Sequence, residues 1–227
     1  MTDNKLPASI VAVMGASGSG KSSSIVAALQ ADKGSRRIIF DPGGDYAAFG
    51  DPVDDVRAAL RVVVKAGAGA FRLVFNPSFD AERARRQFSD LCELAYAAGD
   101  VLTVADELEG VMSPSWSPPG WALLVLRGRK RGVRIIGASQ RPAGIEKRFW
   151  SLATVIRSGR LNYADDAATV ARVLMVEPRD VLALADLDFI QRSVRRPVVQ
   201  WGRIAWARGR PVESILREKN LLPDAPA

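Results

Sequence analysis

The sequence predicts an α/β protein in which a mostly parallel central sheet is flanked by helices. Short, uniformly apolar runs, of which residues 10–14 (IVAVM) are the first, alternate with segments whose apolar residues recur at helical spacing. Such runs are typical of strands buried on both faces, and their alternation with helices is typical of parallel βαβ units. The chain has 227 residues, 48% hydrophobic and 25% charged, an ordinary composition for a globular protein.

Each element is predicted from its local pattern. Apolar runs predict strands at residues 10–14, 37–40, 71–75, 101–105, 133–139 and 153–157. Helical spacing predicts helices at residues 20–31, 52–66, 80–98, 164–174 and 178–185. We expect a surface loop rich in Pro and Ser at residues 111–121 and a β-hairpin at residues 188–206.

The residue types that the chain lacks exclude several kinds of site. There is no histidine, which excludes Ser-His-Asp and Cys-His mechanisms and zinc sites with histidine ligands. The one cysteine, Cys92, can form no intrachain disulfide, which favours a reducing compartment, and its apolar helical surroundings predict a place in the core. No apolar run reaches the ~18 residues of a membrane helix, and the N-terminal apolar stretch is short for a signal peptide. We therefore expect no membrane span and no secretion.

The charge balance favours an anionic partner. The net charge is +7 and the pI is near 10.0, which most often indicates nucleic acid. A GC-rich coding sequence, which raises arginine and alanine together, is the alternative explanation. Candidate phosphate contacts are residues 83–86 (RARR) and 192–197 (RSVRRP), and the alternative for each is a solvated basic face.

The strongest motif is GASGSGKS at residues 15–22, which matches the phosphate-binding pattern G-x-x-x-x-G-K-[ST] between a strand and a helix. Glycines let the backbone wrap around a phosphate, and the helix N-terminus attracts anions. Lys21 is expected to reach the β- and γ-phosphates of ATP, and Ser22 is expected to ligate Mg²⁺. The expected nucleotide-binding residues are Gly15, Ala16, Ser17, Gly18, Ser19, Gly20, Lys21, Ser22 and Ser23.

Polar residues at the ends of two other strands complete the predicted site. Asp106 and Glu107 follow the strand at 101–105, an arrangement typical of a Walker B strand, although acids often follow strands. Asp106 is expected to hold Mg²⁺ through water, and Glu107 is expected to polarise the attacking water as a base. Gln140, after the strand at 133–139, is expected to contact the γ-phosphate or that water. A strand-terminal glutamine bonded to the backbone is the alternative.

A basic turn at residues 127–132 (RGRKRG) precedes the strand that ends before Gln140. In a parallel sheet this turn lies at the opposite end from the phosphates of its own subunit, across a strand of roughly 23 Å. We therefore predict that Arg129 acts as an arginine finger on the nucleotide of a neighbouring subunit. A solvated basic loop is the alternative.

Four segments together resemble the FtsK/HerA class of P-loop ATPases, namely GASGSGKS, FDPGGDY (40–46), VADE (104–107) and GRKRGVRIIGASQRP (128–142). The resemblance covers about residues 8–160 and implies a RecA-like P-loop NTPase fold, a hexameric ring and ATP-driven movement of double-stranded DNA. The chain shows no N-terminal barrel, membrane helix or winged helix, and in this it looks like the genome-packaging ATPases of tailless phages with an internal membrane. We predict one ATPase domain over residues 1–227, with a motor core at about 8–160 and C-terminal helices and a hairpin at 161–227.

The function implied by this resemblance is an ATPase that uses ATP and Mg²⁺ to package a viral genome into a preformed capsid. Its expected partners are double-stranded DNA, further copies of the chain, and capsid or internal-membrane portal proteins. We expect it in the host cytoplasm or at the packaging vertex of the virion. The alternatives are a plasmid or conjugative DNA pump of the same class, a P-loop small-molecule kinase, and a non-catalytic nucleotide-binding assembly protein. Neither of the last two has a use for a base at Glu107.

Overall fold

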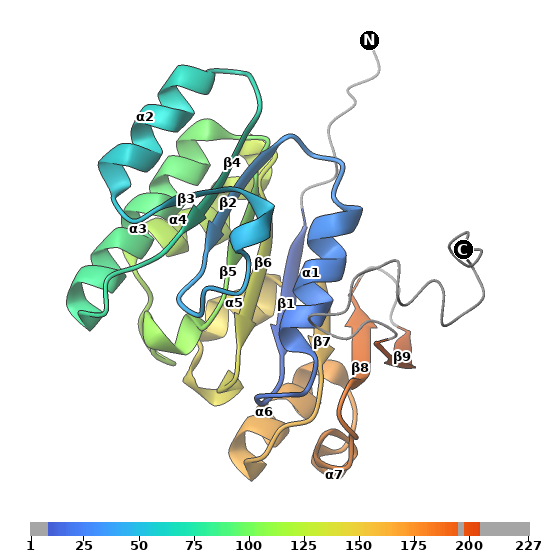
Figure 1. Cartoon of the computed structure of the whole chain (residues 1–227). Helices are drawn as coiled ribbons and strands as arrows, with labels where there is room; N and C mark the ends of the chain where they lie inside the picture. The colour runs from blue at the N-terminus through green and yellow to red at the C-terminus, as the bar shows by residue number, and fades with distance from the viewer. Residues whose placement is uncertain (1–8, 195–197, 205–227) are drawn as a thin grey trace, which may run out of the picture.

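The computed structural model describes residues 9–194 and 198–204, which build one sheet with helices on both faces (Figure 1). The sheet has nine strands in the order β3-β4-β2-β5-β6-β1-β7-β8-β9. Strands β1 to β7 run parallel to one another, and β8 and β9 add an antiparallel hairpin beside β7 at one edge. The predicted fold class, a mostly parallel sheet flanked by helices, is confirmed.

The element bounds follow the chain order. The strands are β1 (Ile10–Met14), β2 (Arg36–Phe40), β3 (Asp51–Val53), β4 (Phe71–Phe75), β5 (Leu102–Ala105), β6 (Arg134–Ser139), β7 (Val155–Ser158), β8 (Asp188–Ser193) and β9 (Val199–Arg203). The α-helices are α1 (Lys21–Ala31), α2 (Val56–Ala66), α3 (Ala81–Ala98), α4 (Pro119–Arg127), α5 (Lys147–Leu152), α6 (Ala164–Leu174) and α7 (Pro178–Leu182). Short 3₁₀ turns are η1 (Ala47–Phe49), η2 (Leu108–Gly110), η3 (Gly128–Arg131) and η4 (Pro142–Gly144).

The two faces of the sheet are covered by different helices. On one face the buried residues of α1 pack with Tyr46 against strand side chains such as Val13. On the other face the apolar sides of α2 to α6 pack against side chains such as Met14, which follows Val13 and points the opposite way. Figure 1 shows α1 in front of the sheet, with α2, α3 and α4 behind it. Cys92 lies in the second cluster and is buried, as predicted.

A chain of aromatic rings joins that second helical layer to the sheet. Phe40 of β2 contacts Phe88 of α3 at a centroid distance of 4.8 Å. Trp121 of α4 contacts Phe88 at 5.4 Å on one side and Phe149 of α5 at 5.4 Å on the other. Helix α4 approaches α3 so closely that a Cβ on Gly120 would lie 2.0 Å from the carbonyl oxygen of Ser89. Glycine is therefore required at that position for the two helices to pack.

Two sequence predictions were wrong in part. The segment predicted as a helix at 52–66 begins as the edge strand β3, and α2 starts only at Val56, where Asp55 caps it by accepting from the Ala58 N–H at 3.1 Å. Pro52 lacks an N–H, which an edge strand tolerates. The predicted loop at 111–121 ends earlier than expected, because Pro119 begins α4.

The segment 111–121 is also less exposed than predicted. Val111 and Met112 are buried, and Trp121 has no exposed surface. Helices α4 and α5 were not predicted from the sequence. Both are short, and α4 (PGWALLVLR) is apolar over most of its surface, so it shows little amphipathic periodicity.

The C-terminal predictions hold within the described residues. Helices α6 and α7 are present, and α7 ends at Leu182 rather than at residue 185. Strands β8 and β9 form the predicted hairpin, while residues 195–197 and 205–206 of its predicted range lie outside the described residues. Among the helices of the described part, none combines the length and the apolar character that crossing a membrane requires.

Candidate functional site

The loop of the GASGSGKS motif connects the end of β1 to the start of α1, at the edge of the sheet where the parallel strands end. Residues at or just after the ends of the two strands that flank β1 hold the first residues of this loop. Gly15 N–H donates to the Ser139 carbonyl at 3.2 Å, and Ala16 N–H donates to the Arg160 carbonyl at 2.8 Å. Gly18 and Gly20 have φ values of 78° and 93°, a left-handed backbone that favours glycine. The loop therefore curls tightly and leads into the N-terminus of α1.

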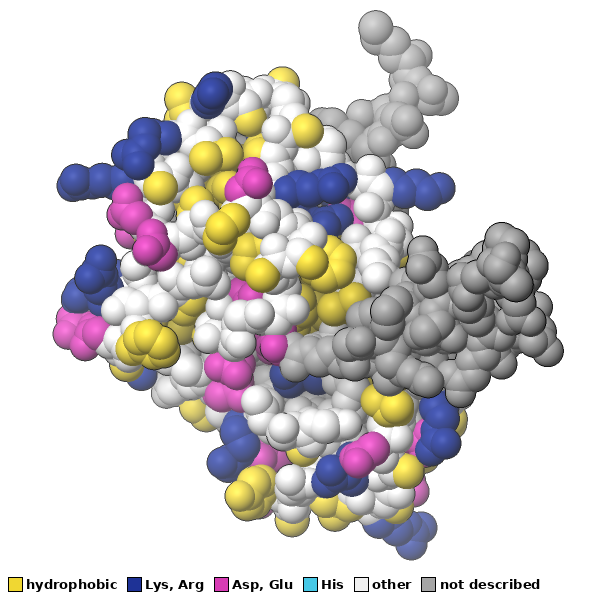
Figure 2. All heavy atoms as spheres, viewed as in Figure 1, with side chains coloured by type: hydrophobic (Ala, Val, Ile, Leu, Met, Phe, Trp, Pro, Cys, Tyr) yellow, Lys and Arg dark blue, Asp and Glu magenta, His cyan; other side chains and the backbone are white. Residues whose placement is uncertain are grey.

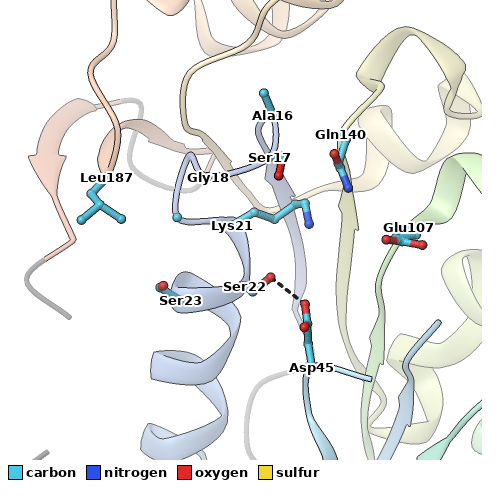
Figure 3. Close-up of a pocket in the computed structure, with 11 residues that line it drawn as sticks. Ala16, Ser17, Gly18, Lys21, Ser22, Ser23, Asp45, Glu107, Gln140 and Leu187 are labelled. Carbon is cyan, nitrogen blue, oxygen red and sulfur yellow. Dashed lines mark hydrogen bonds between the residues drawn. The ribbon is translucent and has the colours of Figure 1, made fainter. Parts of the chain in front are cut away.

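A pocket of about 240 Å³ lies over this loop (Figure 3). Its lining brings together the loop and residues that follow β2, β5 and β6. The lining residues are Ala16, Ser17, Gly18, Gly20, Lys21, Ser22, Ser23, Asp45, Glu107, Gln140 and Leu187. Of the predicted nucleotide-binding residues, Gly15 and Ser19 do not line the pocket. Ser19 is 1% exposed and packs against Gly159, where an added Cβ would come within 2.9 Å of the Ser19 side chain.

Lys21 lies on the floor of the pocket and pairs with a carboxylate. Its Nζ atom lies 3.3 Å from Oδ1 of Asp106, and both side chains are almost fully buried. Oδ1 of Asp106 also accepts from the Glu107 N–H at 2.8 Å, and Oδ2 accepts from the Tyr46 hydroxyl at 2.6 Å. Burial and the adjacent Asp106 charge raise the pKa of Tyr46 far above its usual value, so its hydroxyl stays protonated and donates.

Ser22 is held by a residue that we did not predict for the site. Its hydroxyl donates to Oδ2 of Asp45 at 3.1 Å, drawn as a dashed line in Figure 3. Asp45 belongs to the segment FDPGGDY, which contributed only a family resemblance to the sequence analysis. Asp41 braces this loop by accepting the N–H groups of Asp45 and Tyr46 at 2.9 and 2.8 Å. The sequence feature that could have identified Asp45 is its place as an acidic residue after a parallel strand, at the same edge of the sheet as Asp106.

Glu107 occupies a strained position at the rim of the pocket. Its φ and ψ are 52° and 46°, a left-handed conformation that is uncommon for a residue with a side chain. Burial raises the pKa of Glu107, and the negative charges of Asp106 and Glu109 raise it further, while Lys21 acts in the opposite direction. A carboxylate with a raised pKa is well suited to accept a proton near neutral pH.

Gln140 extends from the end of β6 into the same pocket, and Figure 3 shows its amide directed toward the amine of Lys21. Its backbone N–H donates to Oε1 of Glu109 at 2.9 Å. Sequence reasoning did not single out Glu109, which links the segment after β5 to the segment after β6. Beyond Gln140, Arg141 donates to the buried Asp166 at 2.8 Å, and Ala143 N–H donates to the same side chain at 2.9 Å.

Arg129 lies far from this pocket. It is exposed on the turn η3, before the N-terminal end of β6, whereas the pocket lies beyond the C-terminal ends of the strands. Arg129 borders a separate groove of about 230 Å³ whose rim includes Leu126 and Leu152, 53% and 38% exposed. By contrast, Arg131 is engaged with the end of α3, because it donates to the carbonyls of Tyr96 at 3.3 Å and Ala97 at 2.8 Å.

The two candidate DNA-contacting segments are placed differently. Arg83, Arg85 and Arg86 are exposed near the start of α3, where Arg86 pairs with Glu82. Of residues 192–197, Arg192 of β8 donates to the Val173 carbonyl at 3.0 Å, and residues 195–197 lie outside the described residues. Figure 2 shows basic side chains scattered over the visible face, with no single continuous basic patch.

Known proteins resemble this chain in sequence and in fold. Residues 4–102 match the family described as "Helicase HerA, central domain". Protein P9 of Pseudoalteromonas phage PM2 is 30% identical over 191 residues, which cover 82% of this chain and 84% of that protein.

Solved structures share the fold at lower identity. The genome packaging NTPase B204 from Sulfolobus turreted icosahedral virus 2, in complex with ATP-gammaS, has a TM-score of 0.66 at 19% identity. The match covers 87% of this chain and 98% of that one. The bacterial conjugative coupling protein TrwB has a TM-score of 0.62 at 12% identity, covering 93% and 89%.

Proposed function

Because the chain belongs to the HerA-type family of P-loop ATPases, together with Protein P9 of phage PM2, we propose that it hydrolyses ATP to drive double-stranded DNA into a viral capsid. The observation that carries this proposal is the pocket that combines Lys21 and Ser22 with Asp106 and Glu107. The packaging role is supported by the likeness in fold to B204, which is described as a genome packaging NTPase. That likeness spans 98% of B204 and is therefore not confined to the P-loop.

The P-loop would bind the phosphates of ATP. The glycine-rich loop and the N-terminus of α1 supply positive potential to that end of the pocket. Lys21 would exchange its ion pair with Asp106 for contacts with the β- and γ-phosphates. Leu187 would contact the nucleoside end from the opposite wall.

The oxygen ligands in the pocket fit Mg²⁺, which prefers hard oxygen donors and substrate phosphates. Ser22 would ligate the cation directly, and Asp106 would hold it through water. No group of three or more His, Cys, Asp or Glu side chains in the described part of the chain could hold a metal by itself. When bound, Mg²⁺ would neutralise charge that develops on the phosphates.

Glu107 would accept the proton of the attacking water, and Gln140 would orient that water or contact the γ-phosphate. The raised pKa of Glu107 and its position on the pocket rim support the role of base. The neighbouring Asp106 is already engaged by Lys21 and Tyr46, which leaves Glu107 as the acid at the rim of the pocket.

Arg129 would complete the site of a neighbouring subunit in a ring, most simply a hexamer. Its exposure and its place at the edge opposite the pocket support this role, because a six-residue strand spans roughly 20 Å. The adjacent groove with Leu126 and Leu152 offers apolar surface for the same contact. The wider proposal places the ring at a packaging vertex, in contact with capsid or internal-membrane portal proteins.

The proposal is tested by measuring ATP turnover with and without duplex DNA, together with displacement of a third strand from a triplex. We expect duplex DNA to stimulate turnover and ATP to drive displacement. Lys21→Ala should lose nucleotide binding and turnover. Glu107→Gln should retain binding and lose about 10²–10⁴-fold in turnover, because only proton abstraction is removed.

Two outcomes would contradict the proposal. Wild-type turnover by Glu107→Gln would exclude that residue as the base. Turnover that requires a small-molecule phosphoryl acceptor would favour the kinase alternative. A conjugative pump, which the TrwB-like fold also allows, would show the same motor activity in these assays but would not associate with procapsids.

A further inference from the structure

Asp45 reaches the P-loop from the end of β2 and is built firmly into the pocket wall. Its Oδ2 atom accepts the Ser22 hydroxyl at 3.1 Å, and its own N–H donates to Oδ1 of Asp41 at 2.9 Å. Asp41 is 1% exposed and also accepts the N–H of Tyr46. The contact between Asp45 and Ser22 is thus made by a braced loop.

Both P-loop side chains that would meet a nucleotide and its metal already have an acidic partner within the chain. Lys21 pairs with Asp106 of the β5 end, and Ser22 pairs with Asp45 of the β2 end. A carboxylate in this position acts in opposite directions on the two components of a metal–nucleotide complex. It repels a phosphate that arrives without a metal, and it attracts a divalent cation beside Ser22.

We propose that Asp45 makes nucleotide binding depend on Mg²⁺. Its carboxylate disfavours the metal-free nucleotide and favours the metal-bound one, so it selects the form that can be hydrolysed. The inference rests on the proposed function, since it requires that the P-loop binds ATP and ADP. It assigns to Asp45 a specificity role that the family motifs of the chain did not indicate.

The test compares the affinity for a fluorescent ADP in saturating Mg²⁺ with the affinity in EDTA. Asp45→Asn keeps an amide oxygen that can accept from Ser22, so it removes charge with little change in shape. We expect the affinity in Mg²⁺ divided by the affinity in EDTA to fall by about tenfold in this variant. Metal-free ADP should bind more tightly, and Mg²⁺ should increase the affinity for ADP by a smaller factor. Asp45→Glu should retain most of the ratio, and Asp54→Asn, which removes an exposed carboxylate outside the pocket, should leave it unchanged.

Equal weakening of both affinities by Asp45→Asn would show a merely structural role and would overturn the inference, as would an unchanged ratio. Asp45→Ser, which is also neutral but has a shorter side chain, serves as the second variant if the asparagine variant unfolds, and should lower the ratio in the same way. If Lys21→Ala bound ADP as tightly as the wild type, the proposed nucleotide site itself would be wrong. If Lys21→Ala weakens ADP binding and Asp45→Asn lowers the ratio of affinities, both the nucleotide site and the role of Asp45 are supported. If Lys21→Ala weakens binding and Asp45→Asn leaves the ratio unchanged, only the role of Asp45 is wrong.

Discussion

Asp106 is the residue at which the polar network of the site converges. It accepts from Lys21, from Tyr46 and from its own neighbour's N–H, while only 3% of its surface is exposed. These three donors fix the orientation of the Asp106 carboxylate beside Lys21. Glu107 lies one residue further along, has a raised pKa and lines the open pocket. Two adjacent acids thus have different environments, which suits one for charge stabilisation and the other for proton transfer.

The pH dependence of turnover should report this difference. Glu107 must be deprotonated to act as a base, so turnover should rise with pH through a raised pKa, above the usual range of a glutamate. Glu109→Gln removes one of the negative charges that raise this pKa, and glutamine keeps an oxygen that can accept from Gln140 N–H. The acid limb of the kcat profile should therefore shift to lower pH.

The control for this measurement is Glu93→Gln, which removes an exposed charge from α3 and should leave the pH profile of kcat unchanged. A limb that stays in place or shifts to higher pH in Glu109→Gln would contradict the proposed coupling between Glu109 and Glu107.

At the scale of elements, the loops after β2, β5 and β6 form one wall of the pocket because these strands are parallel and end at the same edge. Helices α3, α4 and α5 support these strands from behind through the ring contacts of Phe40, Phe88, Trp121 and Phe149. The rigidity of the pocket wall therefore depends on an apolar layer that contains no site residue.

Removing the central ring of this layer should cost stability. Trp121 has no exposed surface and contacts both Phe88 and Phe149, so Trp121→Ala should lower the free energy of unfolding by about 3–5 kcal/mol. Trp116 is 47% exposed in the preceding loop, and Trp116→Ala should cost no more than about 0.5 kcal/mol. Denaturant unfolding of the two variants measures both values, and equal losses would refute the assigned importance of the ring chain.

In the whole molecule, the proposed site residues lie at two opposite ends of the parallel strands. Lys21, Asp106 and Glu107 lie at one edge, and Arg129 lies at the other. One subunit cannot bring them together, whereas a ring of copies in head-to-tail contact can. Activity should then belong to the interface between two subunits.

Mixing inactive variants tests this arrangement. Arg129→Ala should bind ATP and lose about 10³–10⁵-fold in turnover, and Lys21→Ala should be inactive through failure to bind it. A mixture should regain part of the activity, because some interfaces pair an intact P-loop with an intact Arg129. If Arg127→Ala or Arg131→Ala, rather than Arg129→Ala, regains activity when mixed with Lys21→Ala, then that residue is the arginine finger. The hydrogen bonds of Arg131 to the end of α3 argue against Arg131 in this role. Absence of rescue with every arginine variant of 127–131 would contradict the shared site.

Duplex binding should be independent of sequence and should weaken steeply with salt, because its affinity would come from phosphate contacts. Replacing the exposed Arg83 and Arg85 by alanine should reduce the slope of log affinity against log salt by about 2. Arg172→Ala, which removes an exposed arginine from α6, is the matched control. A slope unchanged by the double substitution would place the DNA contact elsewhere.

The sequence by itself determined the features that are local. The P-loop is a contiguous motif, and the acids and glutamine that follow β5 and β6 could be placed at one edge because parallel strands end together. The sequence also predicted the strands of the core, whose apolar runs are unmistakable, but not α4, whose nearly uniform apolar surface gives no helical periodicity.

The tertiary structure alone decided the contacts between distant segments. Ser22 and Asp45 are 23 residues apart, Glu109 and Gln140 are 31 apart, and Tyr46 and Asp106 are 60 apart. Which of these side chains meet depends on the lateral order of the strands, and the order β2-β5-β6-β1 is not encoded in any local periodicity. The same lateral order placed Asp45 beside Ser22.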